Sequence, residues 1–332
     1  MKLLLHTIFA FTPAQRSVLA AALPGVEIAE TGGGDLNLYD GRDVAILVTE
    51  QLPRELAGWP ALRWVQLISA GANQVLGHPL QATDIVVTNA SGTHGVPIAQ
   101  YVTTAVLMAA HRVPEILAFK PTRTWPNRTA LASRPLRGAT VGLLGYGSIG
   151  RECARQLAAL GLRVICLKRD PAAREDRDFN AWPGTGDPAG RLPEAWYGPA
   201  ALEEFVRASD YVVVTVPSTP QTAGLIGARE LAWSKPGAHW VVVSRGGIVE
   251  EAALAAALRT GKVAGATVDC FVREPLPPDH EFFATPNLLL TPHMSGVYAG
   301  FWDIFNTLLA DNLRRFAAGD PLLNRVQHAR GY

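Results

Sequence analysis

Short apolar runs alternate with helical stretches along the first third of the chain. Pro13–Leu23 has the pattern of a helix, with Thr12 before it as an N-terminal cap and proline at its first position. Such alternation is typical of a small α/β domain. A long apolar helical stretch, Val96–Phe119, follows, and we expect it to connect this domain to the next. The strands predicted here are Lys2–His6, Val44–Val48, Arg63–Ile68 and Ile85–Thr88.

From Ala139 the apolar runs become continuous. The run Tyr211–Val214 is apolar at every position, as expected for a parallel strand buried on both faces. Helical stretches separate these runs, and the pattern predicts a doubly wound parallel sheet. The predicted strands are Thr140–Leu144, Arg163–Lys168, Asp210–Val216, His239–Ser244, Val263–Asp269 and Asn287–Thr291. The predicted helices are Ser148–Leu160, Ala200–Ala208, Ala228–Trp233, Glu250–Thr260 and, in the tail, Gly300–Ala318.

The segment 139–168 carries the strongest chemical signal. It reads as strand, turn, helix and strand, and its turn has the G-x-G-x-x-G spacing of a dinucleotide-binding βαβ unit. The first glycine permits the tight turn, the second lets backbone approach a pyrophosphate, and the third lets helix pack against strand. The helix then directs its free N–H groups at the phosphates. The alternative is an ordinary structural turn. The residues expected to bind the pyrophosphate are Gly145, Gly147, Ser148, Ile149 and Gly150.

The end of the second strand of this unit bears on the choice of cofactor. Proteins that bind NAD usually place an acidic residue about 20 residues after the glycine turn, where it binds the ribose. Here Lys168 stands 18 residues after Gly150, and Arg169 follows. Because cations bind a 2′-phosphate that a carboxylate would repel, we expect NADP(H), with NAD(H) possible. In the NAD alternative, these cations are a solvated strand end and Asp170 binds the ribose.

The segment Asp170–Pro199 interrupts the alternation of strands and helices. It is rich in proline, glycine and charge, and a connection of this length is unusual inside a compact domain. We interpret it as a surface insertion near the adenosine end of the cofactor. Whether it covers a ligand or only extends the surface stays open.

Composition narrows the class of partner and the compartment. The formal net charge is +1, so no basic field indicates nucleic acid or a membrane surface. With 48% hydrophobic residues the chain is expected to fold. Cys153, Cys166 and Cys270 show no paired spacing, which favours reduced core residues in a cytoplasmic protein and no metal site. The apolar start is interrupted by His6 and is interpreted as a strand rather than a signal peptide.

Three predicted strands deliver polar side chains to one edge of the second sheet. Arg245, Glu274 and His293 each follow a different strand, and ligands of open α/β sheets bind at that edge. Hydride addition to a carbonyl leaves charge on oxygen, and histidine is suited to donate the neutralising proton. A neighbouring carboxylate favours the protonated ring. A guanidinium binds the carboxylate of a keto acid through two parallel hydrogen bonds.

Each member of this trio has a structural alternative. His293 could cap a loop against a backbone carbonyl, and Glu274 could be a surface charge. Arg245 could pair with Asp269 or Glu274 for structure alone. Their joint position beside the dinucleotide turn favours the catalytic interpretation.

These motifs resemble the D-isomer-specific 2-hydroxyacid dehydrogenases over nearly the whole chain. The resembling stretches are LRGATVGLLGYGSIG, VPSTPQTAGLIG, VVVSRGGIVEEAALAAALRTGKVAGATVDCFVREPLP and LLLTPHMSG, and Glu274 stands 29 positions after Arg245 as in the family. The resemblance implies that Arg245 anchors the substrate, that Glu274 is the glutamate of the catalytic trio and that His293 is the acid/base. It implies an α/β fold in which a Rossmann domain, residues 98–295, is inserted into a smaller flavodoxin-like substrate domain, residues 1–97 and 296–332.

The resemblance also implies roles for residues around the cofactor and substrate. Asp269, with the Ser244 backbone, would hold the nicotinamide carboxamide, and Thr215 and Pro217 would line the adenosine and ribose. A loop of the first domain would receive the substrate carboxylate on its backbone N–H groups, which is physically reasonable for a nest of amides. A homodimer with the Val96–Phe119 helix at its interface is implied as well. The implied loop residues are Ala70, Gly71 and Ala72.

The resemblance and the residues together predict an oxidoreductase. We expect an NADP-preferring reductase of small 2-keto acids, with glyoxylate and hydroxypyruvate as the best candidates, that yields D-2-hydroxy acids. Two alternatives stay open. One is a non-catalytic dinucleotide sensor that binds partner proteins, as the resembling corepressors do. The other is a phosphite or amino-acid dehydrogenase on a related scaffold.

Overall fold

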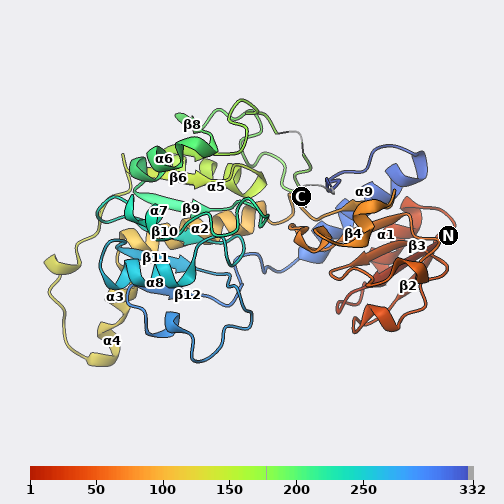
Figure 1. Cartoon of the computed structure of the whole chain (residues 1–332), viewed down its shortest axis with the longest axis horizontal. Helices are drawn as coiled ribbons and strands as arrows, with labels where there is room; N and C mark the ends of the chain where they lie inside the picture. Colours follow the sequence, from red (N-terminus) through yellow and green to blue (C-terminus); the bar gives the residue numbers. More distant parts are fainter. Residues whose placement is uncertain (177, 328–332) are drawn as a thin grey trace. The chain divides into compact units, whose positions relative to one another are not determined.

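The structure, a computed structural model, describes residues 1–176 and 178–327, which form two compact units (Figure 1). The first unit contains residues 1–94, 178–183 and 298–327, and the second contains residues 95–176 and 184–297. The expected domain boundaries, at 97/98 and 295/296, lie within three residues of the observed changes at 94/95 and 297/298. The passage of residues 178–183 into the first unit was not predicted.

The first unit is built on a five-stranded parallel sheet with the flavodoxin-like order β2-β1-β3-β4-β5. Successive side chains of a strand point to opposite faces. Leu3 and Leu5 therefore pack in one core with two helices, while Leu4 packs on the other face among short 3-10 turns. The strands are β1 (Lys2–His6), β2 (Glu27–Glu30), β3 (Val44–Thr49), β4 (Trp64–Leu67) and β5 (Val86–Thr88); the 3-10 turns are Leu36–Leu38, Leu56–Gly58, Asn73–Val75 and Pro79–Ala82.

The two helices of this unit are α1 (Pro13–Ala22) and α9 (Phe301–Ala318), which pack together on one face of the sheet. Thr12 caps α1 as predicted. Its hydroxyl accepts the N–H of Gln15 at 3.2 Å, and the Gln15 side chain accepts the N–H of Thr12 at 2.9 Å. α9, near the end of the chain, thus belongs to the first unit.

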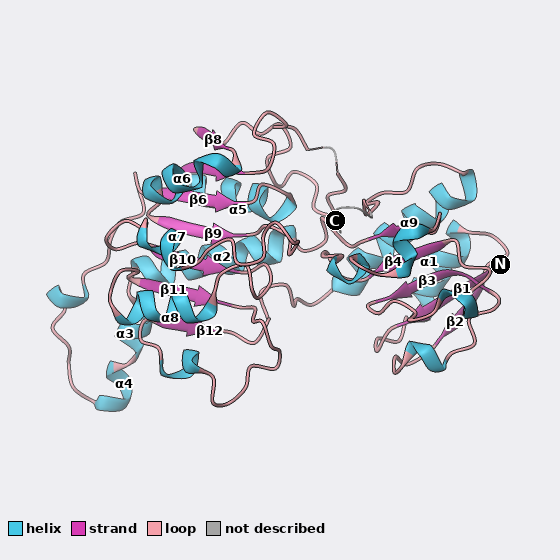
Figure 2. Cartoon of the chain, in the orientation of Figure 1, coloured by secondary structure: helices cyan, strands magenta, loops and turns pink. Residues whose placement is uncertain are grey.

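The second unit is built on a seven-stranded parallel sheet in the Rossmann order, β12-β11-β10-β9-β6-β7-β8, with helices on both faces (Figure 2). Val213 of β9 packs in the core with α2 and α5, and Val212 in the core with α6, α7 and α8. The strands are β6 (Thr140–Leu144), β7 (Arg163–Leu167), β8 (Ala195–Tyr197), β9 (Tyr211–Val214), β10 (His239–Val242), β11 (Gly265–Val268) and β12 (Leu288–Leu290). The helices are α2 (Gly95–Ala110), α3 (Val113–Leu117), α4 (Phe119–Thr122), α5 (Ser148–Ala159), α6 (Leu202–Ala208), α7 (Ala228–Ala232) and α8 (Glu251–Arg259), with 3-10 turns at Thr129–Leu131, Pro199–Ala201 and Glu281–Ala284.

The prediction of one helix over Val96–Phe119 is wrong. α2 ends at Ala110, Arg112 takes a left-handed conformation with φ +53°, and α3 and α4 follow at a bend of 67°. Pro114 explains the break, because it lacks an N–H and its ring would clash with the carbonyl of the preceding turn. Among the described residues no single helix is long and apolar enough to span a membrane, although this bent pair passes on length and composition.

The segment Asp170–Pro199 is more than the surface insertion we expected. Its end forms β8, which pairs with β7 and adds a strand to the sheet. Residues 178–183 pack with the first unit, where Ala181 donates its N–H to Gly92 and the Trp182 indole donates to the Thr93 carbonyl at 3.0 Å. We call residues 178–183 the strap. The segment is therefore part of both units.

Candidate active site

The glycine-rich turn joins β6 to α5 in the geometry that a dinucleotide requires. Gly145 has φ +107°, and a Cβ there would lie 2.8 Å from the Thr215 hydroxyl. A Cβ on Gly150 would lie 2.4 Å from the Gly145 carbonyl, whereas one on Gly147 would meet open space. Among the described residues no side-chain hydrogen bond caps α5 at Gly147. The crowded positions tighten the turn, and the open one leaves the first N–H groups of α5 free for phosphate oxygens.

Residues around this turn also fit a bound nicotinamide dinucleotide. The Thr215 hydroxyl lies 3.2 Å from the Leu144 carbonyl and 3.1 Å from that of Gly145, so it braces the turn. The Pro217 carbonyl accepts a hydrogen bond from Thr222 at 2.6 Å. The buried Ser244 hydroxyl has no partner among the described residues, which leaves a polar group for a ligand at the end of β10.

Lys168 and Arg169 follow β7 directly, as predicted. The Lys168 ammonium donates to the Ala173 carbonyl, and burial together with the Arg151 guanidinium lowers the pKa of Lys168. Asp170, the ribose ligand of the NAD alternative, accepts the N–H of Ala172 at 3.0 Å and so is engaged in its own turn. A half-buried ammonium at this strand end is compatible with a 2′-phosphate.

The insertion is anchored on the glycine-rich turn and on α5. The Tyr146 hydroxyl, from the turn itself, donates to Asp187 at 2.7 Å. Buried Arg151 pairs with Asp176 at 2.9 Å and donates to the Asp187 carbonyl at 2.6 Å. Buried Glu152 accepts the N–H of Gly186 at 2.7 Å. The residues on either side of the strap are therefore fixed to the element that would bind the pyrophosphate.

Glu274 and His293 form the central contact of the candidate site. The Glu274 Oε2 atom lies 2.8 Å from His293 Nδ1, and its Oε1 atom accepts the N–H of Phe271 at 2.9 Å. The two side chains are 36% and 41% exposed, so a substrate can reach them. Because Glu274 engages Nδ1, the other ring nitrogen is the one left for proton transfer. Neither residue is the isolated cap or surface charge of the structural alternatives.

The backbone of His293 is held in a strained conformation. Its φ of +54° is left-handed, which costs a residue with a side chain about 1–2 kcal/mol. Fully buried Asp269 stabilises the following turn, since its oxygens accept the N–H groups of Met294 and Ser295, each at 2.8 Å. The Thr291 hydroxyl also donates to Asp269 at 2.5 Å. In this structure Asp269 thus orients His293, and its contact with a carboxamide stays a prediction.

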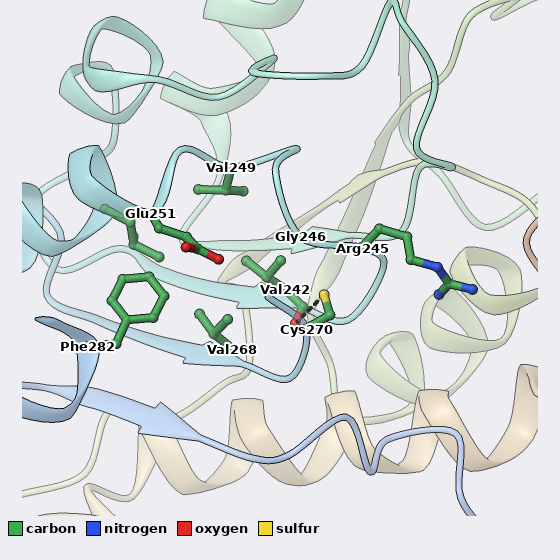
Figure 3. A pocket seen from close by; sticks show the side chains of 9 residues that line it. Val242, Arg245, Gly246, Val249, Glu251, Val268, Cys270 and Phe282 are labelled. Carbon is green, nitrogen blue, oxygen red and sulfur yellow. Dashed lines mark hydrogen bonds between the residues drawn. The ribbon is translucent and has the colours of Figure 1, made fainter. Parts of the chain in front are cut away.

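Arg245 emerges from β10 next to the Glu274 segment. Its Nη1 atom donates to the Ser244 carbonyl at 2.8 Å, and within the described residues it makes no ion pair with Asp269 or Glu274. Figure 3 shows its side chain turned away from a small cavity that its backbone helps to line. The guanidinium is therefore not consumed by a structural ion pair. Because β10, β11 and β12 are neighbours in the sheet, the trio shares one edge.

In the first unit, the loop after β4 contains the predicted substrate residues Ala70, Gly71 and Ala72. The Ser69 hydroxyl donates to the Gly71 carbonyl at 2.7 Å, and within the described part of the chain the three backbone N–H groups have no acceptor. Ala72 itself is buried. Such a set of free amides suits an anion.

Several residues that hold the site were not predicted from the sequence. The Tyr101 hydroxyl of α2 lies 2.6 Å from that of Thr291, which extends the chain of hydrogen bonds to Asp269. Burial raises the pKa of Tyr101 to about 12, so it stays a neutral donor. Nothing in an apolar helix distinguishes one tyrosine as a brace. Thr291 carried a signal, because it stands directly before the Pro-His pair.

The cysteines are free and buried, as expected, and burial raises the pKa values of Cys166 and Cys270 to about 12. Thiols of this kind remain protonated and are poor nucleophiles. Over residues 1–176 and 178–327, no cluster of three metal-binding side chains is found.

Comparison with known proteins gives a consistent result. The profile of the D-isomer specific 2-hydroxyacid dehydrogenase family, NAD binding domain, matches residues 103–295. The (S)-sulfolactate dehydrogenase of Chromohalobacter salexigens is 35% identical over 84% of this chain and 86% of its own length.

Two solved structures cover this whole chain and 99% of their own. A D-isomer specific 2-hydroxyacid dehydrogenase from Xanthobacter autotrophicus Py2, in complex with NADPH and MES, has a TM-score of 0.84 at 30% identity. An NADPH-dependent glyoxylate/hydroxypyruvate reductase from Sinorhizobium meliloti, in complex with NADP and sulfate, has a TM-score of 0.81 at 25% identity.

Proposed function

This chain belongs to the D-isomer specific 2-hydroxyacid dehydrogenase family, and we propose that it reduces small 2-keto acids, such as glyoxylate and hydroxypyruvate, with NADPH. Membership makes it an NAD(P)-dependent enzyme that interconverts 2-keto and 2-hydroxy acids. The observation that carries the proposal is the Glu274–His293 hydrogen bond of 2.8 Å at the sheet edge that Arg245 shares.

The side chains suggest a division of labour during the reaction. A nicotinamide dinucleotide whose pyrophosphate was held by the glycine turn would supply the hydride for the keto carbon. Arg245 binds the substrate carboxylate and polarises the carbonyl. His293 donates a proton from its outer ring nitrogen to the oxygen as charge develops there, while Glu274 stabilises the charged ring. Within the first unit, the free amides at Ala70–Ala72 offer hydrogen-bond donors to a carboxylate.

The small keto acids are favoured by a comparison that covers the whole chain, since the similar protein from Sinorhizobium meliloti is a glyoxylate/hydroxypyruvate reductase in complex with NADP. The Chromohalobacter relative, which is named for a sulfonated acid, matches 84% of this chain.

The preference for NADPH is supported by the two cations after β7. It is also supported by the NADPH and NADP complexes of the similar solved proteins.

Cytoplasmic location is supported by three buried free thiols. Homodimer formation is supported by apolar side chains on the segment after α2, where Leu117 is 62% and Trp125 is 76% exposed. Light scattering of the wild type and Leu117→Glu tests assembly: a dimer that dissociates in the variant is expected.

Steady-state kinetics of the purified protein test the proposed function. We expect NADPH oxidation with glyoxylate and hydroxypyruvate, a D-configured product from hydroxypyruvate, and kcat/KM at least tenfold lower with sulfopyruvate. Preferential turnover of sulfopyruvate would overturn the substrate assignment. Phosphite oxidation would identify the dehydrogenase alternative, and binding of NADPH without turnover of any acid would favour the sensor.

A further inference from the structure

Glu251 lines a small cavity that Arg245 of the candidate active site also borders. It is the first residue of α8, and its side chain points into the small cavity that also borders Gly246 and Cys270 (Figure 3). With a volume of about 10 Å³, the cavity accommodates about one water molecule and is far too small for a substrate. The Glu251 carboxylate therefore does not bind a substrate in this cavity, and its role follows from its contacts with the protein.

Both oxygens of Glu251 hold the segment that carries Glu274. Oε1 accepts the backbone N–H of Val272 at 2.8 Å, and Oε2 lies 3.2 Å from Nε2 of His280. The Glu251 and His280 side chains are only 18% and 20% exposed, so this pairing is shielded from water. Since Val272 precedes Glu274 and His280 follows it, one carboxylate grips the segment on both sides of Glu274.

The hydrogen bonds of His280 define its protonated nitrogen. The backbone N–H of Phe282 donates to Nδ1 at 3.3 Å, so Nδ1 is the acceptor. Nε2 therefore carries the hydrogen and donates it to Glu251. The ring also packs edge-on against Phe282, with centroids 4.9 Å apart. These contacts fix the orientation of the His280 ring, with Nε2 as the donor and Glu251 as the acceptor.

The peptide held by Glu251 also supports the backbone beside Arg245. A Cβ on Gly246 would lie 2.0 Å from the Phe271 carbonyl carbon and 2.2 Å from the Val272 nitrogen. The chain after Arg245 thus rests directly on the Phe271–Val272 peptide. The Phe271 N–H, at the other end of the same residue, binds Glu274. Any shift of this peptide therefore moves both Arg245 and Glu274.

We propose that Glu251 is a positioning residue, which fixes Arg245 relative to the Glu274–His293 pair by holding the Phe271–Val272 peptide. The proposal rests on the proposed function for its catalytic consequence. In Glu251→Gln the shape is retained, and one oxygen can still accept the Val272 N–H. The new amide group then faces the Nε2–H of His280, so that two donors oppose each other.

The test compares Glu251→Gln with Glu281→Gln, which removes a nearby carboxylate from an exposed pair with Arg259. For Glu251→Gln we expect kcat with glyoxylate to fall about tenfold, because small misplacements of reacting groups slow catalysis. The KM for NADPH should stay within twofold. The pH profile of kcat/KM and the NMR titration of the His293 ring should both move. Glu281→Gln should change none of these.

A second variant keeps the test decisive if Glu251→Gln does not fold. His280→Gln removes the other half of the same contact and should shift the pH profile in the same direction. A lower melting temperature with unchanged kcat and pH profile would mean that Glu251 is only structural, and would overturn the proposal. If the wild type reduces no keto acid, the proposed function fails. The His293 titration in Glu251→Gln against Glu281→Gln then still decides whether Glu251 positions Glu274.

Discussion

The strained backbone of His293 links local geometry to chemistry. A left-handed histidine persists only where its surroundings fix it, and here the buried Asp269 carboxylate binds the two N–H groups that follow. Thr291 and Tyr101 extend that support to α2. The ring is therefore held against Glu274 by the protein itself, which is the preorganisation that the proposed proton transfer requires.

Replacing His293 by alanine should lower kcat by about 10²–10⁴-fold, because it removes the proton donor of the proposed reaction. Circular dichroism should show an unchanged fold. His111→Ala, at an exposed position after α2, serves as the control and should retain full activity. Wild-type kcat in His293→Ala would remove this residue from the mechanism.

Replacing Arg245 should chiefly impair the binding and turnover of the keto acid. In Arg245→Ala we expect kcat/KM for glyoxylate to fall about 100-fold or more, with the KM for NADPH nearly unchanged, because a charge-assisted bidentate contact is lost. Arg245→Lys should recover only part, since an ammonium cannot form the parallel pair. Arg207→Ala, in an exposed pair with Glu203, is the matched control. A normal KM for glyoxylate in Arg245→Ala would show that another cation binds the carboxylate.

The sequence placed Arg245, Glu274 and His293 on one edge because each follows a strand, and parallel strands end on the same side. It could not reveal Glu251 or Tyr101 as supports. Their roles depend on which backbone N–H or hydroxyl comes within 3 Å, and this is set by packing between segments far apart in the chain. Residue type and spacing carry no such information.

At the scale of elements, the glycine turn and the insertion depend on each other. Tyr146→Phe deletes the hydroxyl that donates to buried Asp187 and should lower the free energy of unfolding by about 1–3 kcal/mol, measured by urea denaturation. Tyr197→Phe, on β8 in the same unit, should change it by less than about 0.5 kcal/mol. Equal effects of the two changes would show that the turn does not rely on the insertion.

Lys168, which follows β7, should determine the preference for NADPH over NADH. In Lys168→Asp we expect the KM for NADPH to rise about tenfold or more while that for NADH changes little, because a charge-assisted contact to phosphate is worth about 1.5–3 kcal/mol. Kinetics with both cofactors measure this directly. Lys120→Asp on α4 controls for net charge. If the wild type already prefers NADH, Lys168 has no role in selection.

Strong apolar patterns predicted most elements, and the failures have physical causes. β2 escaped because the run EIAE is short, acidic and half exposed at a sheet edge. β8 escaped because AWY has only three residues and lies in a segment dominated by turn-forming residues. The break after α2 depends on Pro114, whose effect is visible in the sequence but was outweighed by the surrounding apolar residues.

For the whole molecule, His239 should make stability depend on pH. It starts β10, where burial lowers its pKa to about 4 from an unfolded value near 6.5. Between these values the unfolded chain binds the proton and the native protein does not. The free energy of unfolding should therefore fall by about 1–3 kcal/mol as pH drops from 6.5 toward 4.

Urea titrations at several pH values measure this dependence. His239→Gln should show a flatter slope between pH 6.5 and 4, whatever its stability at neutral pH, whereas His111→Gln should keep the wild-type slope. The carboxylates of Glu152 and Asp187, whose pKa values are lowered from 4.5 and 3.8, begin to add their own losses only as the pH falls through those unfolded values. Identical slopes in wild type and His239→Gln would rule out the assignment.

The strap decides how this protein can be divided. Its Phe179 carbonyl lies so close to Gly92 that a Cβ there would clash, and its Trp182 ring packs 5.9 Å from that of Tyr298. A gene that fused residue 94 directly to residue 298 would delete this covering, so the Thr93 carbonyl would keep only its hydrogen bond from Tyr298 and the Tyr298 ring would lose its contact with Trp182. Separating the two units therefore requires four breaks in the chain instead of two. An exchange of the second unit between relatives would have to leave the six residues 178–183 with the first unit.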